Sequence, residues 1–302
     1  MKDKLFGVYV PLVTPLSDDG EQINESELRA LCRFLIQKRV HGFFPVGTTG
    51  ECAFLTIEER KRIAEVVVEE TAGAIPVIIH TGMPTTRESI ELTQHARDIG
   101  AEAAAVVVPY YFSLDEQEIF AHYEAILKAV PDFPLLAYNI PHNAKNYVTP
   151  AIIQALRKKY SALIGVKNSI SSLTDFQEFV AIGDENFYPF IGNDRMIVPA
   201  LVAGACGSVS ANALLFPEIF VELFEHYYAQ RLHEAQVAQK KINHFMRVLG
   251  QEPSIAQYKA GLELHGLHSG GVRRPFRNLS ETEKTALLQL LKQLTQEFAR
   301  DE

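Results

Sequence analysis

A lysine at the end of a short apolar run is the residue of this sequence with the most distinctive chemistry. Lys167 ends residues 163–167 (LIGVK), a run too short for a helix and typical of a strand covered on both faces. Partial desolvation there can lower the pKa of an ammonium by several units from about 10.4. The neutral amine is a nucleophile toward carbonyl groups. For a lone lysine, a strand cap with its ammonium in solvent or paired with a carboxylate is the simpler interpretation.

Other polar groups also follow apolar runs. Residues 47–51 (GTTGE) put two hydroxyls and several backbone amides in one tight turn, which can hold a carboxylate as an anion nest. Tyr110 and Tyr111 follow a further run, and Tyr138 ends the next. A glycine-rich turn is often only a turn, and a tyrosine pair usually serves packing. A catalytic role becomes the better interpretation if the fold brings these side chains to the same end of a sheet.

The elements that must position these groups alternate regularly. Amphipathic helices with N-capping signals, such as Thr56 with Glu59 and Thr149 with Pro150, separate the apolar runs. The predicted strands are residues 6–11, 42–46, 75–79, 104–108, 135–138, the lysine run, 187–191 and 205–211. Eight such units in about 225 residues predict an α/β fold, the (βα)8 TIM barrel, whose functional residues lie at the carboxyl ends of the strands.

The strand pattern stops near residue 230, and the remaining sequence is helical. Residues 232–249 and 253–264 predict two helices, and Ser280 with Glu283 opens a third. That last helix has an apolar side made of Leu287, Leu290, Leu291, Leu294 and Phe298. We therefore predict a catalytic barrel at residues 1–230 and a C-terminal region of three helices at residues 231–302.

Composition excludes several classes of partner. The chain has 302 residues, 47% of them hydrophobic, and a formal net charge of −8, which argues against nucleic acid. Its three cysteines are widely spaced without metal-ligand spacing, so neither a disulfide framework nor a metal site is expected. The N-terminal apolar run is too short for a signal peptide, and no run reaches the length of a membrane span. These features favour a cytoplasmic protein with a small-molecule substrate and no membrane partner.

Four motifs together resemble one superfamily. They are GTTGE at residues 47–51, PYY at 109–111, YNIP at 138–141 and GVK at 165–167. In this order and spacing, over nearly the whole chain, they resemble the dihydrodipicolinate synthase / N-acetylneuraminate lyase superfamily. The resemblance implies a (βα)8 barrel, commonly a tetramer, in which the strand-six lysine forms a Schiff base with pyruvate or a related 2-oxo acid. It also implies that no metal or organic cofactor takes part, and a homo-oligomer, dimer or tetramer, is expected.

The resemblance also implies individual roles. Lys167 corresponds to the Schiff-base lysine and Tyr138 to the proton shuttle above it. Tyr111 resembles the tyrosine that reaches into a neighbouring subunit's relay, in which Thr48 also takes part. The other implied site residues bind the 2-oxo acid through hydroxyls or backbone: Gly47, Thr48, Thr49, Gly192 and Gly207.

The sequence departs from the synthases where the second substrate is chosen. Asn143 stands two residues after the YNIP motif, where synthases carry an arginine that binds the carboxylate of aspartate semialdehyde, and Asn168 replaces an acidic residue. A neutral amide cannot form the bidentate pair of a guanidinium with a carboxylate. We therefore expect an aldolase acting on a 2-oxo-3-deoxy sugar acid or a sialic-acid-like substrate. The alternatives are a 4-hydroxy-tetrahydrodipicolinate synthase, with Lys145 reaching the acidic group, and a non-catalytic barrel that binds a 2-oxo acid.

Overall fold

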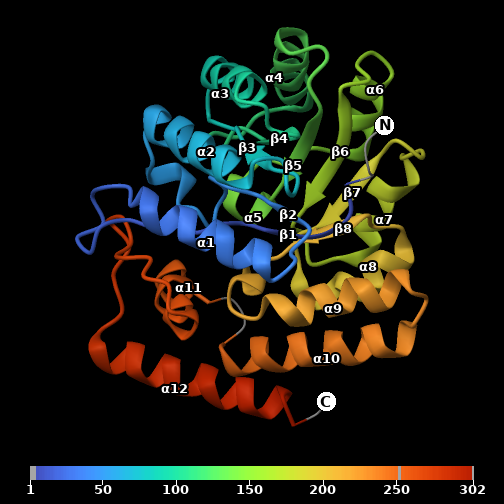
Figure 1. Cartoon of the computed structure of the whole chain (residues 1–302). Helices are drawn as coiled ribbons and strands as arrows, with labels where there is room; N and C mark the ends of the chain where they lie inside the picture. Colours follow the sequence, from blue (N-terminus) through green and yellow to red (C-terminus); the bar gives the residue numbers. More distant parts are fainter. Residues whose placement is uncertain (1–4, 251–252, 301–302) are drawn as a thin grey trace. The chain divides into compact units, whose positions relative to one another are not determined.

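A single parallel sheet of eight strands organises the chain (Figure 1). The computed structural model describes residues 5–250 and 253–300. Every pairing between the described strands is parallel, in the order β2-β1-β8-β7-β6-β5-β4-β3. The strands are β1 (Gly7–Val10), β2 (Gly42–Phe43), β3 (Ile78–His80), β4 (Ala103–Val107), β5 (Leu135–Asn139), β6 (Leu163–Asn168), β7 (Tyr188–Ile191) and β8 (Gly207–Val209).

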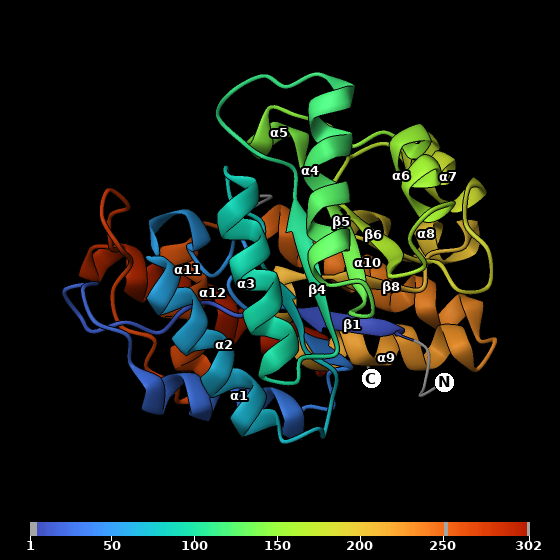
Figure 2. The ribbon, with the colours of Figure 1, turned by 90° about the horizontal axis from the view of Figure 1, so that it is seen from above.

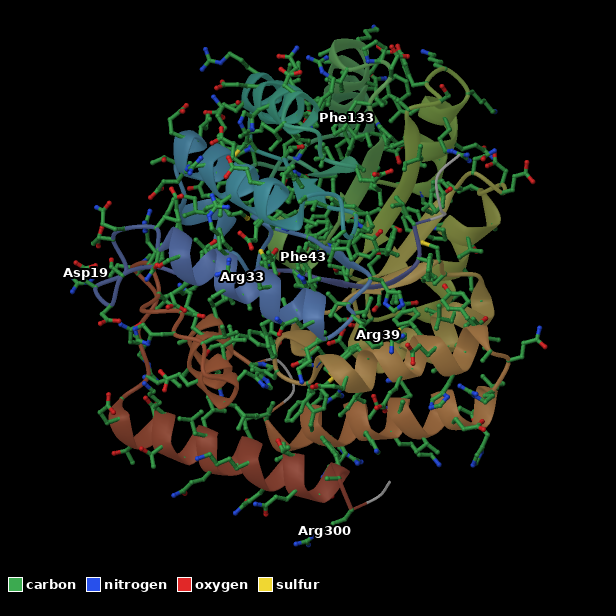
Figure 3. All side chains as sticks on the ribbon, viewed as in Figure 1. Asp19, Arg33, Arg39, Phe43, Phe133 and Arg300 are labelled. Atoms are coloured by element: carbon green, nitrogen blue, oxygen red, sulfur yellow. The ribbon has the colours of Figure 1, made fainter. Side chains whose placement is uncertain are left out.

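The two ends of this strand order meet. Phe43 of β2 forms a parallel bridge with Val77, just before β3, and the Phe43 amide donates to the Pro76 carbonyl at 3.0 Å. Phe43, which is labelled in Figure 3, is completely buried. The sheet is therefore a closed barrel, and the predicted (βα)8 TIM fold is confirmed.

The second strand is shorter than the sequence predicts. Residues 42–46 are apolar, but β2 ends at Phe43 and Val46 has a φ of 50°. A β-branched residue is rarely found in this left-handed region, because its side chain crowds the backbone there. The apolar run thus continues as buried turn, since Phe44, Pro45 and Val46 are all buried.

Residues 5–9, 41–44 and 75–210 form one of two compact units. This first unit contains the strands, except Val10 at the end of β1, and the helices that follow β3 to β7 along the chain. Figures 1 and 2 show α3 and α4 side by side. The helices are α3 (Thr86–Asp98), α4 (Glu116–Ala129), α5 (Pro141–Ala144), α6 (Pro150–Arg157), α7 (Leu173–Ala181) and α8 (Ile197–Ala203).

The second unit comprises Val10–Val40, Pro45–Ala74 and residues 211–250 and 253–300. Its helices are α1 (Glu25–Gln37), α2 (Ile57–Thr71), α9 (Pro217–Tyr228), α10 (Leu232–Val248), α11 (Ile255–Gly261) and α12 (Glu281–Phe298). Helices α9 and α10 lie side by side (Figure 1). The predicted C-terminal helices are confirmed as α10, α11 and α12, while the domain boundary at residue 230 remains a prediction that falls between α9 and α10.

Local sequence signals explain where these helices begin. Thr56 and Ser280 each cap a helix and exchange hydrogen bonds with a glutamate three residues later, as predicted. The apolar side of α12 buries Leu287, Leu291, Leu294 and Phe298, and Leu290 is half-buried. Among the residues described, no helix has the length and apolar character needed to cross a membrane.

Candidate active site

Three neighbouring strands place Lys167 inside the first unit. Lys167 on β6 lies in register with Tyr138 on β5 and with Phe190 on β7. The lysine is 5% exposed and Tyr138 is 2% exposed. The sequence-predicted pair of lysine and tyrosine is therefore brought together by strand pairing alone, near the carboxyl ends of both strands.

Aromatic rings surround the lysine amine. Its Nζ lies 3.9 Å from the ring centre of Tyr138 and 4.0 Å from that of Phe44. The Tyr138 ring in turn contacts His80 edge to face, with centres 5.6 Å apart. Ring faces attract a cation and cannot hydrogen-bond as water does, so they hold the amine in a largely dry pocket. Sequence reasoning missed Phe44, which lies inside an apolar run, and His80, which directly follows one.

The residue after the lysine faces the other way. Successive side chains of a strand alternate between its two faces. Asn168 is fully buried, and its Oδ1 accepts a hydrogen bond from Asn139 Nδ2 at 3.3 Å. The Asn139 carbonyl also accepts from the Ser169 amide at 2.9 Å. Asn168 thus joins the ends of β5 and β6 on the face opposite Lys167. Its side chain is not beside the lysine, so any part it has in substrate choice would be indirect.

Two glycines occupy positions where backbone approaches closely. The amide of Gly192, just after β7, donates to the Asn168 carbonyl at 2.8 Å, and an added Cβ would lie 2.2 Å from Ser169 Oγ. At Gly207 on β8 an added Cβ would lie 2.3 Å from the Gly7 carbonyl oxygen. Neither site can take a side chain without movement of its neighbours. Their part in lining the 2-oxo acid pocket remains a prediction.

Tyr111 lies in an exposed loop after β4. It is 77% exposed, has a φ of 83°, and meets Phe112 edge to face with ring centres 5.0 Å apart. Buried Asn146 holds the loop, because its Nδ2 donates to the carbonyls of Pro109 and Phe112, each at 2.7 Å. The loop is therefore fixed at its base and presents two aromatic rings to solvent.

Asn143 lies on the four-residue helix α5, directly after β5. Pro141 opens this helix, and Lys145 ends it with a φ of 67°. Asn143 and Lys145 are both exposed. The position that an arginine holds in synthases is thus on a short surface helix, four residues after the end of β5.

The threonine turn belongs to the second unit. The Gly47 carbonyl accepts from the amides of Gly50 at 3.0 Å and Cys52 at 3.2 Å, and the Thr48 carbonyl accepts from Glu51 at 3.1 Å. Thr48 is exposed, Thr49 is half-buried and Gly47 is buried. The backbone bonds hold the turn in one conformation with Thr48 exposed, and its use as a carboxylate site remains a prediction.

In residues 5–250 and 253–300, no group of three or more His, Cys, Asp or Glu side chains is arranged to hold a metal ion. Cys32, Cys52 and Cys206 are free thiols, and burial raises the pKa of the Cys32 thiol to about 12. A thiol with such a pKa is protonated at neutral pH and is a poor nucleophile.

A closed parallel barrel with a buried lysine amine at a strand end is the architecture of a (βα)8-barrel enzyme. The family model "Dihydrodipicolinate synthetase family" matches residues 4–294. The chain belongs to this family, whose members are lyases and aldolases, so it is a lyase.

Individual relatives cover nearly all of the chain. The 4-hydroxy-tetrahydrodipicolinate synthase of Methanopyrus kandleri is 35% identical over 95% of this chain and 96% of its own length. The crystal structure of YagE, a prophage protein of E. coli K12 in complex with pyruvate, has a TM-score of 0.91 at 28% identity, covering 97% of this chain and 99% of that one. The 2-keto 3-deoxygluconate aldolase of Picrophilus torridus has a TM-score of 0.85 at 29% identity, covering 92% and 99%.

Proposed function

We propose that this lyase forms a Schiff base between Lys167 and pyruvate or a related 2-oxo acid, and makes or breaks a carbon–carbon bond to an aldehyde. The observation that carries the proposal is the enclosure of the Lys167 amine, 5% exposed, between the rings of Tyr138 and Phe44. Support comes from the relative YagE, whose structure is described as a complex with pyruvate. The aldehyde we propose is the neutral, hydroxylated one released from a 2-oxo-3-deoxy sugar acid, or a sialic-acid-like counterpart.

In this mechanism the lysine supplies the electron sink. The neutral amine of Lys167 adds to the ketone of the 2-oxo acid to give a carbinolamine, which takes up a proton and loses water to give an iminium. Loss of a proton from the adjacent carbon gives an enamine, whose carbon attacks the aldehyde carbonyl. The resulting alkoxide takes a proton, and water hydrolyses the iminium to release product and restore the amine. In the cleavage direction the same steps run in reverse, with no net oxidation.

Tyr138 is the proposed proton carrier for these steps. Its ring centre lies 3.9 Å from the Lys167 amine, and the two residues are in register on adjacent strands. Thr48 and Tyr111 are proposed to complete its relay. The hydroxyls of Thr48 and Thr49 and the backbone of Gly47, Gly192 and Gly207 are proposed to bind the 2-oxo acid, fixing its carbonyl for attack.

Tyr111 supports a proposal about assembly. A tyrosine that is 77% exposed, with strained backbone and a second exposed ring beside it, is a costly surface feature for a monomer. We propose that the chain is a homo-oligomer, a dimer or tetramer, in which Tyr111 enters the site of a neighbouring subunit.

Asn143 supports the choice of aldehyde. It provides hydrogen-bond donors and an acceptor, which suit hydroxyl groups, where a synthase would provide a guanidinium for a carboxylate. The relative from Picrophilus torridus is named for 2-keto 3-deoxygluconate, a substrate of this hydroxylated kind. Synthase activity on aspartate semialdehyde is the second candidate. It is favoured by the name of the Methanopyrus kandleri relative and by exposed Lys145 two residues further on.

Borohydride reduction in the presence of pyruvate tests the Schiff base. We expect one reduced adduct per chain, located by peptide mass spectrometry at Lys167, and none in Lys167→Ala. Lys128→Ala removes an exposed lysine paired with Glu124 and should trap as the wild type does. Trapping at another lysine would overturn the proposal.

Turnover of aldehydes with pyruvate then separates the candidates. We expect glyceraldehyde or a longer hydroxylated aldehyde to be a better acceptor than aspartate semialdehyde. The reverse order would establish the synthase. Trapping of pyruvate without turnover of any aldehyde or of any 2-oxo-3-deoxy acid would instead support a non-catalytic binding barrel.

A further inference from the structure

A buried ion pair lies directly after the threonine turn, within the second unit. Lys259 Nζ of α11 is 2.7 Å from Glu51 Oε1, and the two side chains are 1% and 0% exposed. Lys259 Nζ also donates to the Gly271 carbonyl at 2.6 Å. Glu51 is the last residue of the GTTGE motif, so the pair connects the turn to a helix more than 200 residues later in the sequence.

The second carboxylate oxygen of Glu51 is used as well. Its Oε2 accepts a hydrogen bond from the Arg273 backbone amide at 2.7 Å. The Arg273 guanidinium binds both oxygens of Glu59 at 2.7 and 2.9 Å and donates to the Gly20 carbonyl at 3.0 Å. The segment that holds Glu51 is therefore itself held at several points, and Glu51 has little freedom to move.

The backbone at Glu51 shows that this arrangement is maintained against strain. Glu51 has a φ of 60°, in the left-handed region that a glutamate rarely adopts, and its amide donates to the Thr48 carbonyl. The partners of the Glu51 side chain hold this conformation. Through the amide of Glu51, the same conformation holds the carbonyl of Thr48. Thr14 Oγ1 adds a hydrogen bond to the Gly50 carbonyl at 2.8 Å.

Stability alone is a weak reason to bury such a pair. The desolvation of two charges largely offsets their attraction, so apolar side chains of similar size would stabilise the fold as well or better. Burial is the leading effect on Lys259 and lowers the pKa of its ammonium, although the carboxylate of Glu51 opposes this. Unlike an apolar contact, an ion pair fixes the direction of the Glu51 carboxylate.

We infer that Glu51 and Lys259 are positioning residues, which orient the hydroxyls of Thr48 and Thr49 toward the carboxylate of the 2-oxo acid. This inference rests on the proposed function of the threonine turn and adds two residues to it, one of them in the C-terminal helices. Loss of the pair should weaken recognition of the substrate carboxylate while leaving the chemistry at Lys167 intact.

The test compares two carbonyl compounds that differ in the carboxylate. The second-order rate of borohydride trapping at Lys167 is measured for pyruvate and for hydroxyacetone, which has a ketone but no carboxylate. In Lys259→Met the pyruvate rate should fall at least about tenfold relative to the hydroxyacetone rate, because only pyruvate uses the turn. Lys284→Met removes the partly exposed Lys284–Glu263 ion pair of the same unit and should leave the ratio unchanged.

A second variant keeps the test decisive if Lys259→Met does not fold, as judged by circular dichroism. Glu51→Gln/Lys259→Met removes both buried charges and keeps similar volumes, and the same fall in the ratio is expected. An unchanged ratio in the folded variant, with pyruvate still trapped by the wild type, would overturn this inference alone. Failure of the wild type to trap pyruvate at Lys167 would overturn the proposed function from which it starts.

Discussion

Tyr138 and Lys167 stand opposite each other on adjacent strands, and the lysine Nζ lies 3.9 Å from the centre of the tyrosine ring. The ring and the hydroxyl of Tyr138 therefore have separable tasks. The ring encloses the amine, and the hydroxyl is the group that we propose for proton transfer.

Tyr138→Phe separates these tasks. We expect borohydride trapping of pyruvate to persist because the ring remains, while turnover with an aldehyde falls by roughly 10²- to 10⁴-fold, the usual contribution of a positioned acid or base. Tyr123→Phe is the matched control, since it removes another buried hydroxyl, which donates to the Val106 carbonyl at 2.8 Å. Wild-type turnover in Tyr138→Phe would remove Tyr138 from the mechanism.

Asn143→Arg tests the choice of aldehyde. A guanidinium on α5 would offer the substrate carboxylate a charged hydrogen bond worth roughly 1.5 to 3 kcal/mol. That energy corresponds to about one to two decades in specificity. We expect kcat/KM for aspartate semialdehyde, relative to a hydroxylated aldehyde, to rise by that factor. His142→Arg places the same charge on the adjacent exposed residue, and an equal gain there would show that any added positive charge suffices.

Chelation tests the electron sink. An iminium at Lys167 withdraws electrons from the adjacent bond without help from a metal ion, so prolonged treatment with a chelator should leave kcat and KM unchanged. The measurement is turnover before and after dialysis against the chelator. Activity that is lost and then returns with an added divalent metal would contradict the Schiff-base mechanism.

His122 should make stability depend on pH. Burial lowers the pKa of its imidazole from 6.5 to about 4, and its Nδ1 lies 2.9 Å from Thr86 Oγ1. Between these two values the unfolded chain binds a proton that the native chain does not, so stability falls as the pH is lowered from about 6.5 to about 4. The loss is about 3 kcal/mol in the free energy of unfolding.

Denaturant titration at pH 7 and at pH 4.5 measures this contribution. His122→Asn keeps a polar atom near Thr86 without the titration, so the variant should lose less stability than the wild type over this interval. His233→Asn changes an exposed histidine and should follow the wild type. Parallel loss in the wild type and His122→Asn would contradict the assignment.

Much of the architecture follows from local sequence signals. Short runs of apolar residues locate the strands to within a few residues, because parallel strands buried on both faces need continuous hydrophobicity. Caps such as Thr56 and Ser280 locate helix starts, because side-chain oxygens must satisfy free backbone amides there. The early end of β2 was not predictable, since apolarity alone does not reveal that Val46 adopts a left-handed backbone.

The sequence predicted which residues lie at the end of each strand, but not which side chains from different strands come into contact. Lys167 and Tyr138 can be recognised as polar ends of apolar runs. The contact of Phe44 with the Lys167 amine and that of His80 with the Tyr138 ring depend on which strands become neighbours and in what register. The pairing of Asn168 with Asn139 depends on register in the same way, and it places Asn168 on the face opposite Lys167. Contacts of this kind join residues distant in the sequence, so no local pattern encodes them.

Helix α5 has a consequence for how such enzymes diversify. It is four residues long, opened by a proline and closed by the left-handed Lys145, and it carries Asn143 outside the strands. Exchange of an exposed residue on so short a segment disturbs neither the register of β5 nor the enclosure of Lys167. If Asn143 selects the acceptor as we propose, acceptor preference can change during evolution while the chemistry at Lys167 is retained. Relatives of this chain carry the names of different reactions.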